Sequence, residues 1–141
     1  MVSTDLLGAR LAVALRLALI LLAPAAGASP GLVEVAKGGS GGFTTIQAAI
    51  DHAPARGADW TVIHVAAGHY FESLSVPSDK GPLVLVGDGR DATVLEFDGS
   101  FVDSAGAWVA KKVLTNRAND LVVRSMTIRN LAKEPGGSGG K

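Results

Sequence analysis

In one segment near residue 50, apolar residues recur at the spacing of an α-helix. The residues at positions i, i+3, i+4 and i+7 are Ile46, Ala49, Ile50 and Ala53. Thr44 is placed to cap the start of this helix, Gln47 stands three residues later as in a capping box, and Pro54 marks the end. The pattern predicts one short amphipathic helix with a single buried face.

The sequence before and, above all, after the helix predicts short β-strands. Runs rich in β-branched and apolar residues occupy positions 33–36, 60–66, 83–86, 93–97 and 121–128. Turn signals rich in glycine, proline and aspartate separate these runs. One helix followed by strands without helical crossovers excludes a Rossmann-type sheet. A sandwich, a barrel and a parallel β-helix all fit, because periodicity alone does not distinguish them.

Residues 1–28 have the pattern of a secretory signal peptide. Arg10 gives a positively charged start, positions 17–23 form an apolar run, and positions 26–28 provide a small-residue A-x-A cleavage site. Arg16 interrupts the apolar stretch, which is shorter than the ~20 residues needed to span a bilayer. The sequence therefore predicts a secreted protein, with no membrane segment after the signal is cleaved.

Composition restricts the partners of the chain. There are 13 basic and 13 acidic residues, so the net charge is +0 and no basic face for nucleic acid is predicted. Lys111-Lys112 is an isolated pair, which we interpret as solvated. The chain has no cysteine, so a secreted product would have no disulfide. We expect one small domain at 29–132 and a flexible Gly/Ser tail at 133–141.

Four stretches resemble one known family. They are VAKGGSGGFTTIQAAIDHAP at 35–54, VIHVAAGHYFESLSVP at 62–77, LVLVGDGRDATVL at 83–95 and NDLVVRSMTIRNLA at 119–132. In order and spacing they are similar to the N-terminal portion of plant-type pectin methylesterases, or pectinesterases. The resemblance implies an all-β, pectin lyase-like fold, a right-handed parallel β-helix with one short N-terminal capping helix.

The resemblance also implies a reaction, the hydrolysis of galacturonyl methyl esters in pectin during cell-wall modification. In the family, one aspartate attacks the ester carbonyl, a second acts as general acid and base, a glutamine stabilises the oxyanion, and an arginine orients the nucleophile. Two carboxylates in one cleft push their pKa values apart and can take opposite roles. The implied partners are pectin (homogalacturonan) and a proteinaceous inhibitor, no cofactor or metal is implied, and the implied location is the extracellular cell wall.

No catalytic residue can be assigned in this chain by resemblance. The family motifs Q-A-V-A-L, Q-D-T-L, D-F-I-F-G and L-G-R-P-W all follow the segment that 119–132 matches. We therefore expect a truncated family member that is inactive alone. A β-helix cut after Ile128 would expose an apolar cross-section and unpaired backbone groups, so we also expect a marginally stable or aggregating product.

The family's G-x-Y-x-E signature is present as Gly68, Tyr70 and Glu72. We interpret these residues as structural, with Tyr70 and Glu72 forming a buried polar pair that ties a turn to the neighbouring coil. In the weakly matching stretch between the third and fourth segments, Val113 stands where the family has a threonine that lines the substrate cleft.

Other residues carry weaker signals. Gly38 to Gly42 matches the G-x-S-x-G nucleophile elbow formally, but the predicted helix begins too late for Ser40 to be a nucleophile. The chain has no cysteine and no H-E-x-x-H-type spacing, so its histidines are not expected to be metal ligands. These histidines, for which we expect packing or surface roles, are His52, His64 and His69. Trp60 is expected in the core, and Trp108 is either core or a sugar-stacking residue.

Two other interpretations stay open at this level. One is a secreted, non-catalytic protein that binds pectin or caps another β-helix, because an unpaired coil edge can accept a partner strand. The other is a gene-model or splicing artefact without a stable product.

Overall fold

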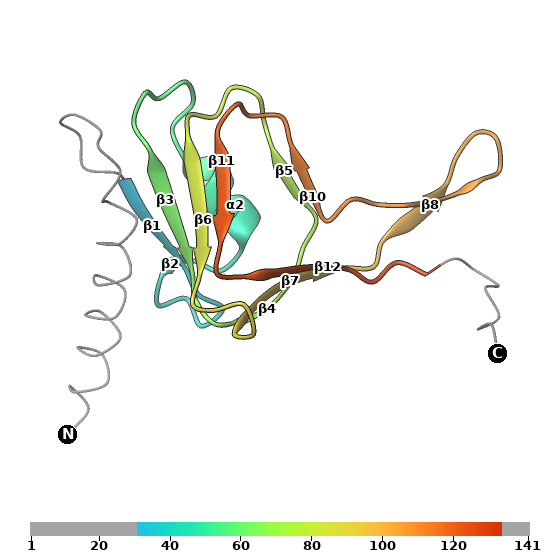
Figure 1. Ribbon diagram of the computed structural model, residues 1–141, viewed down its shortest axis with the longest axis horizontal. Helices are drawn as coiled ribbons and strands as arrows, with labels where there is room; N and C mark the ends of the chain where they lie inside the picture. The colour runs from blue at the N-terminus through green and yellow to red at the C-terminus, as the bar shows by residue number, and fades with distance from the viewer. Residues whose placement is uncertain (1–30, 134–141) are drawn as a thin grey trace.

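The computed structural model describes residues 31–133, which form a stack of β-coils (Figure 1). The largest sheet has five strands in the order β11-β6-β3-β1-β2. Their bounds are Leu121–Arg124, Leu83–Gly87, Thr61–Val65, Gly31–Val35 and Gly42–Phe43. Neighbouring strands are parallel and in continuous register, so that Thr61 pairs with Gly31 on one side and with Leu83 on the other. The expectation of a parallel β-helix is therefore confirmed.

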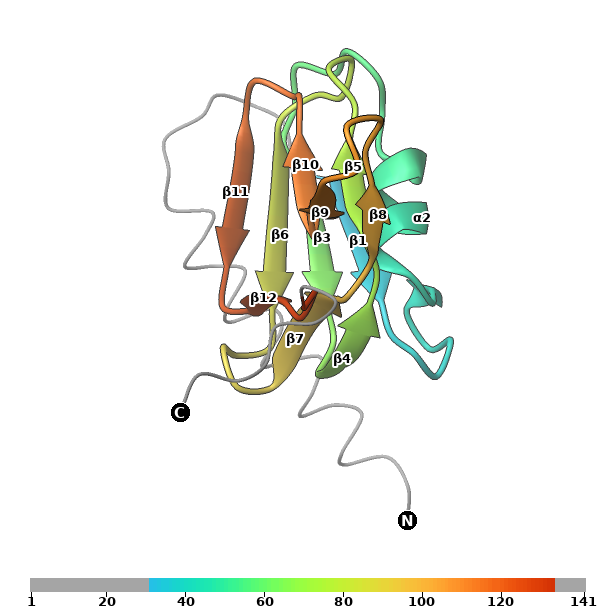
Figure 2. The same ribbon diagram turned by 90° about the vertical axis from the view of Figure 1, so that its right-hand side faces the viewer.

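Two further sheets complete the coils that begin with β3 and β6. The second sheet has three strands in the order β12-β7-β4, which span Thr127–Asn130, Thr93–Phe97 and Gly68–Phe71. The third is a parallel pair, β5 at Leu74–Val76 and β10 at Leu114–Asn116. Figure 2 shows the strands of each sheet side by side, with the coils stacked across the view. One circuit of the chain thus visits all three sheets before it returns to the first.

The core lies inside this stack and is built from alternate strand positions. The fully buried side chains of the coils belong to Val35, Ile63, Val65, Tyr70, Leu74, Val76, Leu83, Leu85 and Leu95. Valines of the opposite strand face, Val62, Val84 and Val86, form a second, smaller cluster. A residue's place in the pleat therefore decides whether it faces the interior or the outer face of the sheet.

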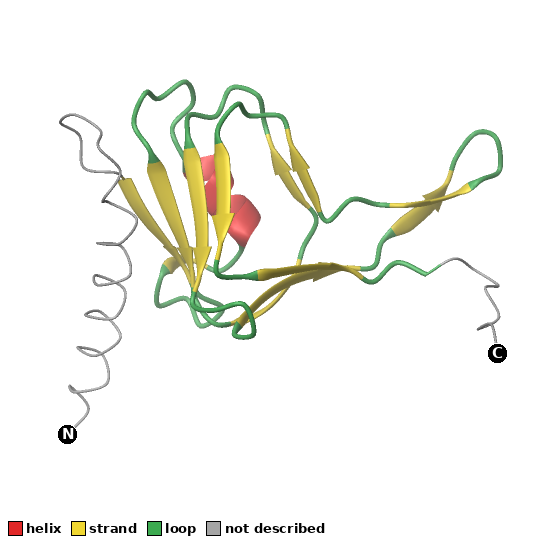
Figure 3. Cartoon of the chain, in the orientation of Figure 1, coloured by secondary structure: helices red, strands yellow, loops and turns green. Residues whose placement is uncertain are grey.

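The helix α2 spans Ile46–His52 and is the one red element of Figure 3. It packs at the end of the stack, beyond β1 and β5 in Figure 2. The predicted apolar face is confirmed, because Ile46, Ala49, Ile50 and Ala53 are all buried. The predicted cap was wrong by one residue, since Thr45 is the N-cap and accepts a hydrogen bond from the Ala48 amide.

Gln47 has a different role from the predicted capping box. Its side chain donates to the Asp51 carboxylate and to the Ser75 carbonyl, and its Oε1 accepts from the Ser75 amide. Because Thr45 rather than Thr44 is the N-cap, Gln47 does not stand at the capping-box position. The residue instead joins α2 to β5 of the next coil.

The predicted strand at 121–128 is in fact two strands, β11 and β12. Between them Ser125 has a positive φ of 53°, which turns the chain from the first sheet to the second. The sequence pattern also missed the short strands β4, β5 and β10. Trp60, expected in the core, is 37% exposed because it lies just before β3 rather than within it.

An antiparallel hairpin leaves the stack between β7 and β10. Its strands are β8, Ser100–Val102, and β9, Trp108–Ala110. Figure 1 shows it projecting from the corner where the second and third sheets meet. The Asp103 carboxylate accepts hydrogen bonds from the amides of Ala105 and Ala107 and so orders the hairpin turn. The additional residues between β7 and β10 thus lie outside the stack.

The last described coil leaves apolar side chains open to solvent. Ile128 and Leu131 are each 40% exposed, while Leu121 and Val123 are partly buried against the core. Within residues 31–133, no helix is long and apolar enough to cross a membrane. The predicted signal peptide, and the predicted tail except for Lys133, lie outside the described residues.

Candidate functional site

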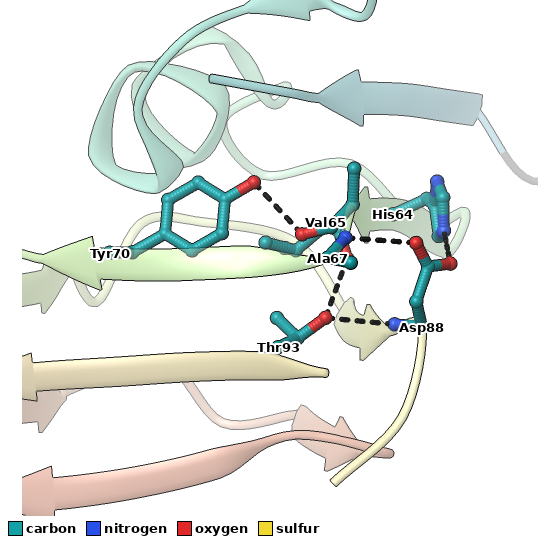
Figure 4. A network of polar contacts seen from close by, with 7 residues as sticks. His64, Val65, Ala67, Tyr70, Asp88 and Thr93 are labelled. Atoms are coloured by element: carbon teal, nitrogen blue, oxygen red, sulfur yellow. Dashed lines mark hydrogen bonds and ion pairs between the residues drawn. The ribbon is translucent and has the colours of Figure 1, made fainter. Parts of the chain in front are cut away.

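The two best sequence signatures meet at one corner of the stack. The G-x-Y-x-E residues begin the second sheet at β4, and the Gly-Asp-Gly segment starts at the last residue of β6 in the next coil. Figure 4 shows the polar contacts around Asp88 that connect these turns. Segments far apart in the sequence therefore form a single polar cluster.

Tyr70 is the largest buried side chain of this corner and is 1% exposed. Its hydroxyl donates to the Ala66 carbonyl at 2.9 Å, and the Lys37 ammonium lies 5.5 Å from the ring centroid. Burial raises the pKa of Tyr70 above its ordinary value of 10.0, and the charges of Asp88 and Glu72 raise it further. The phenol is therefore held neutral by its surroundings.

Glu72 bridges two coils. Its two carboxylate oxygens accept hydrogen bonds from the backbone amides of Ile46 and Gln47, each at 3.1 Å. These amides belong to the first turn of α2, where backbone donors have no partner within the helix. The Glu72 charge also lies at the favourable end of the helix dipole. Tyr70 and Glu72 thus have different partners, and the predicted pairing between them is replaced by two separate anchors.

Gly68 has a backbone conformation that only glycine adopts easily. Its φ is 154°, a region that side chains of the L-series rarely enter. A Cβ at this position would lie 3.5 Å from Tyr70 Cε2, so the ring packs closely over the glycine. The signature therefore combines a turn residue, a core residue and a helix cap.

Asp88 lies in the following coil and its carboxylate binds the turn after β3. One carboxylate oxygen lies 2.8 Å from Nε2 of His64, and the other accepts the Ala67 amide at 2.9 Å. The His64 side chain is 12% exposed and that of Asp88 is 33% exposed. This ion pair or hydrogen bond is partly shielded from water and stabilises the corner more than an exposed pair would.

Thr93 completes the cluster and is fully buried. Its hydroxyl accepts the Asp88 amide at 3.0 Å and donates to the Val65 carbonyl at 3.2 Å. Sequence reasoning did not single out Asp88 or Thr93, although both lie in the segment at 83–95 that carries the resemblance. Their partners are 24 and 28 residues away, so the pairing was invisible without the coil register.

Most polar atoms of this corner bond to backbone groups of a neighbouring turn or helix. These contacts connect two turns and α2 to neighbouring coils. Within residues 31–133, no group of three His, Cys, Asp or Glu side chains is arranged to hold a metal ion.

The other candidates lie apart from this corner. Ser40 is exposed in the turn between β1 and β2, well before α2 begins. His52 packs its ring against Phe43 at 5.1 Å, and exposed His69 bonds to Glu96 at 3.1 Å. Val113 is buried, and its carbonyl accepts the Leu74 amide.

Trp108 lies on the hairpin strand β9 and is half-buried. Its indole Nε1 is buried and has no hydrogen-bond partner among the described residues. A buried N–H without a partner carries a desolvation cost of about 1–3 kcal/mol. Among the described residues, the hairpin therefore contains a buried side-chain donor without a hydrogen bond, and the coils do not.

The single tyrosine of the chain allows a direct test of this electrostatic environment. In an alkaline titration followed by phenolate absorbance, we expect Tyr70 to ionise above pH 10.0 in the native protein. In urea it should ionise near the ordinary tyrosine pKa of about 10. Because the folded-state pKa is raised, the stability linked to Tyr70 is fully present below the unfolded pKa. It is lost as pH rises through the folded value.

The control is Tyr70→Phe, which removes the titrating group. In this pH range the free energy of unfolding of the variant should decline less than that of the native protein, because the contribution of Tyr70 ionisation is absent. A native midpoint equal to that in urea would show that the phenol is exposed to water, contrary to the structure.

One protein-family model, described as Pectinesterase, matches residues 32–137. Among curated proteins, Probable pectinesterase 29 of Arabidopsis thaliana is 37% identical over 98 residues, which cover 70% of this chain and 28% of that protein. The chain therefore spans less than a third of the length of this relative.

Solved structures give the same family likeness. The pectin methylesterase PemA from Erwinia chrysanthemi superposes with a TM-score of 0.64 at 30% identity, covering 81% of this chain and 34% of that one. A pectin methylesterase solved in complex with a hexasaccharide gives a TM-score of 0.60 at 29% identity, over 79% of this chain and 36% of that one.

Proposed function

This chain belongs to the pectinesterase family, and we propose that residues 31–133 build the N-terminal coils of an enzyme that hydrolyses galacturonyl methyl esters of pectin. The observation that carries the proposal is the match of residues 32–137 to the family model, together with a coil stack like that of solved pectin methylesterases. A relative crystallised with a hexasaccharide supports an oligosaccharide as the bound molecule.

We propose a supporting rather than a chemical role for the Glu72 and Asp88 carboxylates. Glu72 is engaged by two helix amides, and Asp88 is engaged by His64 and the Ala67 amide. Ester hydrolysis by two carboxylates requires one of them to be free to attack the carbonyl and the other to exchange protons. These two residues are held in structural contacts instead, so the catalytic pair would come from other residues of the enzyme.

We also propose that the protein acts outside the cell, in the cell wall. The predicted signal peptide at 1–28 and the location of pectin support this. A proteinaceous inhibitor is a further partner implied by the family resemblance. The domain boundaries at 29–132 and 133–141 belong to the same proposal.

Methanol release from methyl-esterified pectin tests the proposed function. We expect no methanol above background from the 141-residue chain alone. We expect activity from a chimera in which residues 31–133 replace the corresponding coils of PemA, because the coil register would be preserved.

The chimera carrying Tyr70→Ala is the matched control and should lose activity together with its folded structure. A folded chimera that releases no methanol would argue against the proposal that these coils support pectinesterase chemistry. Methanol release by the chain alone would contradict the supporting role but retain the esterase function.

The exposed end of the stack favours a second candidate function, a non-catalytic protein that binds pectin or caps another β-helix. Within residues 31–133, Ile128 and Leu131 are exposed, and β11 and β12 pair on one side only. An unpaired strand edge can accept a partner strand. Saturable binding of homogalacturonan by the chain without methanol release in any chimera would favour this candidate.

A further inference from the structure

The strand β11 has a free edge. Among residues 31–133 it pairs with β6 alone, and Figure 2 shows it as the outermost strand of the first sheet. The Leu83 amide donates to the Asp120 carbonyl at 2.9 Å, and Leu83 is the register partner of Leu121. In a parallel ladder every second residue bonds to the same neighbour, so alternate residues from Asp120 onward direct their backbone groups to β6. The backbone groups of Leu121 and Val123 therefore face the free edge.

The side chains of β11 alternate between the two faces of the sheet. Leu121 and Val123 pack against the main core, and Val122 packs against the outer cluster of valines. Asp120 precedes the strand, Arg124 ends it, and both are exposed. By the two-residue period of a strand, these charged residues stand on the same face as Val122. Neither of them forms an ion pair with another described residue.

This order of residues is complementary to itself when the strand is reversed. If two copies of β11 pair antiparallel and are centred on Val122, Asp120 of each copy lies opposite the partner's Arg124. Leu121 then lies opposite the partner's Val123. Both of these residues turn their backbone groups to the free edge, as a hydrogen-bonded antiparallel pair requires. Two-fold symmetry repeats every such contact, so a single match of the strand with itself is used twice.

Other registers of the same pairing lack this match. A shift by one residue would set core-facing side chains opposite outer-face side chains. A shift by two residues in either direction would separate Asp120 from the partner's Arg124. A further shift by two would bring together two aspartates or two arginines, and like charges directly opposite each other are destabilising. The charges of β11 therefore favour one register.

We propose that the 141-residue chain forms a two-fold symmetric dimer in which β11 pairs antiparallel with β11 of a second copy. The apolar side chains of the last described coil provide the driving force, since Ile128 and Leu131 are exposed and Leu121 and Val123 are only partly buried. The pairing also gives hydrogen-bond partners to a strand edge that lacks them. The inference extends the second candidate function, because the β-helix that is capped is another copy of this chain.

Charge reversal tests the proposed contact between Asp120 and Arg124. We expect the native 141-residue chain to sediment as a dimer in analytical ultracentrifugation. Arg124→Asp sets two acids opposite each other at both ends of the pairing, and Asp120→Arg sets two bases there. Each variant should weaken self-association by about tenfold or more, the effect of exchanging two favourable contacts for two repulsive ones. Circular dichroism checks that both variants keep their strands.

Mixing the two variants separates the proposed contact from a general effect of charge. A mixed pair sets the two acids of one copy opposite the two bases of the other, so we expect the mixture to form a heterodimer. Arg56→Asp reverses an exposed cation in the loop between α2 and β3 and should leave the native dimer unchanged. A native chain that is monomeric or sediments as a series of larger aggregates would overturn the proposal. Reversal variants that stay dimeric, or that stay apart on mixing, would also overturn it.

Val122→Cys tests the register without changing a charge. The native chain has no cysteine, so the introduced thiol can form a disulfide only with a second copy. Residues that face each other in a non-hydrogen-bonded antiparallel pair have Cα atoms about 4.5 Å apart, within the range of about 4.4–6.8 Å that a disulfide spans. Under mild oxidation we expect a covalent dimer from Val122→Cys and little from Ser78→Cys, which places an exposed thiol on a loop. Equal yields would contradict the proposed pairing.

These experiments use no pectin. Their outcome therefore leaves the methanol assay of the chimera unaffected, and the dimer and the proposed function are tested separately.

Discussion

Replacing Gly87 by alanine is expected to destabilise the stack by about 3 kcal/mol, the upper end of the usual cost of overpacking. Gly87 is the first glycine of the Gly-Asp-Gly segment and ends β6. A Cβ there would meet the Ser125 carbonyl oxygen, and it would lie 2.8 Å from Thr93 Cβ and 3.0 Å from Met126 Cβ. Because the obstruction includes backbone of the next coil, no side chain can rotate away to relieve it. Urea unfolding followed by circular dichroism measures the loss.

The matched control is Gly89→Ala, two residues further along the same segment. A Cβ on Gly89 would make only an ordinary contact of 3.6 Å with Ala92. Its effect should stay within about 0.5 kcal/mol, as for surface substitutions in general. If both variants unfold at the same urea concentration as the native chain, the close approach of the coils at Gly87 is wrong.

Replacing Tyr70 by alanine is expected to cost about 3–5 kcal/mol, as for other large aromatic side chains removed from a core. The ring is fully buried among the coils, so its removal leaves a cavity that packed neighbours fill only in part. The loss is large enough to unfold a domain of marginal stability. The urea midpoint of unfolding again provides the measurement. The fraction of the protein that stays soluble in the cold is recorded in parallel.

Tyr70→Phe separates the ring from its hydroxyl. It keeps the volume and removes only the donor to the Ala66 carbonyl, so we expect a loss of about 1 kcal/mol. Comparable losses for the two variants would mean that the hydrogen bond, rather than the filled space, dominates at this position. That outcome would contradict the burial of the ring among packed neighbours.

The helix and the longer strands could be predicted because their signals are local. The apolar face of α2 needs only the spacing of four residues, and β7 occupies the predicted positions 93–97. The short strands β5 and β10 could not be predicted, since three residues hold too little alternation to be recognised. Their conformation is set by pairing with each other across the stack rather than by their own sequence.

The candidate site also has a part that the sequence predicts and a part that it does not. The signature Gly68, Tyr70 and Glu72 was found from its resemblance to a family, and a structural interpretation fits its contacts. That Glu72 caps α2 depends on a partner 26 residues away and on a helix start that was predicted one residue early. The His64–Asp88 contact likewise requires the register that sets β3 beside β6. Long-range partners follow from coil stacking, which a single sequence does not display.

The position of α2 at one end of the stack has a consequence for how the chain reaches its fold during synthesis. Residues 46–52 leave the ribosome before any of β3 to β12, and their buried face covers the end that lies beyond β1. Growth of the coils then has a single free direction, which coincides with the order of translation. Parallel pairing between distant strands is slow to find from an unfolded chain, because each pairing closes a long loop. From β6 onward, each newly synthesised strand of the three parallel sheets meets an edge that is already formed, so the search is reduced to one neighbour at a time.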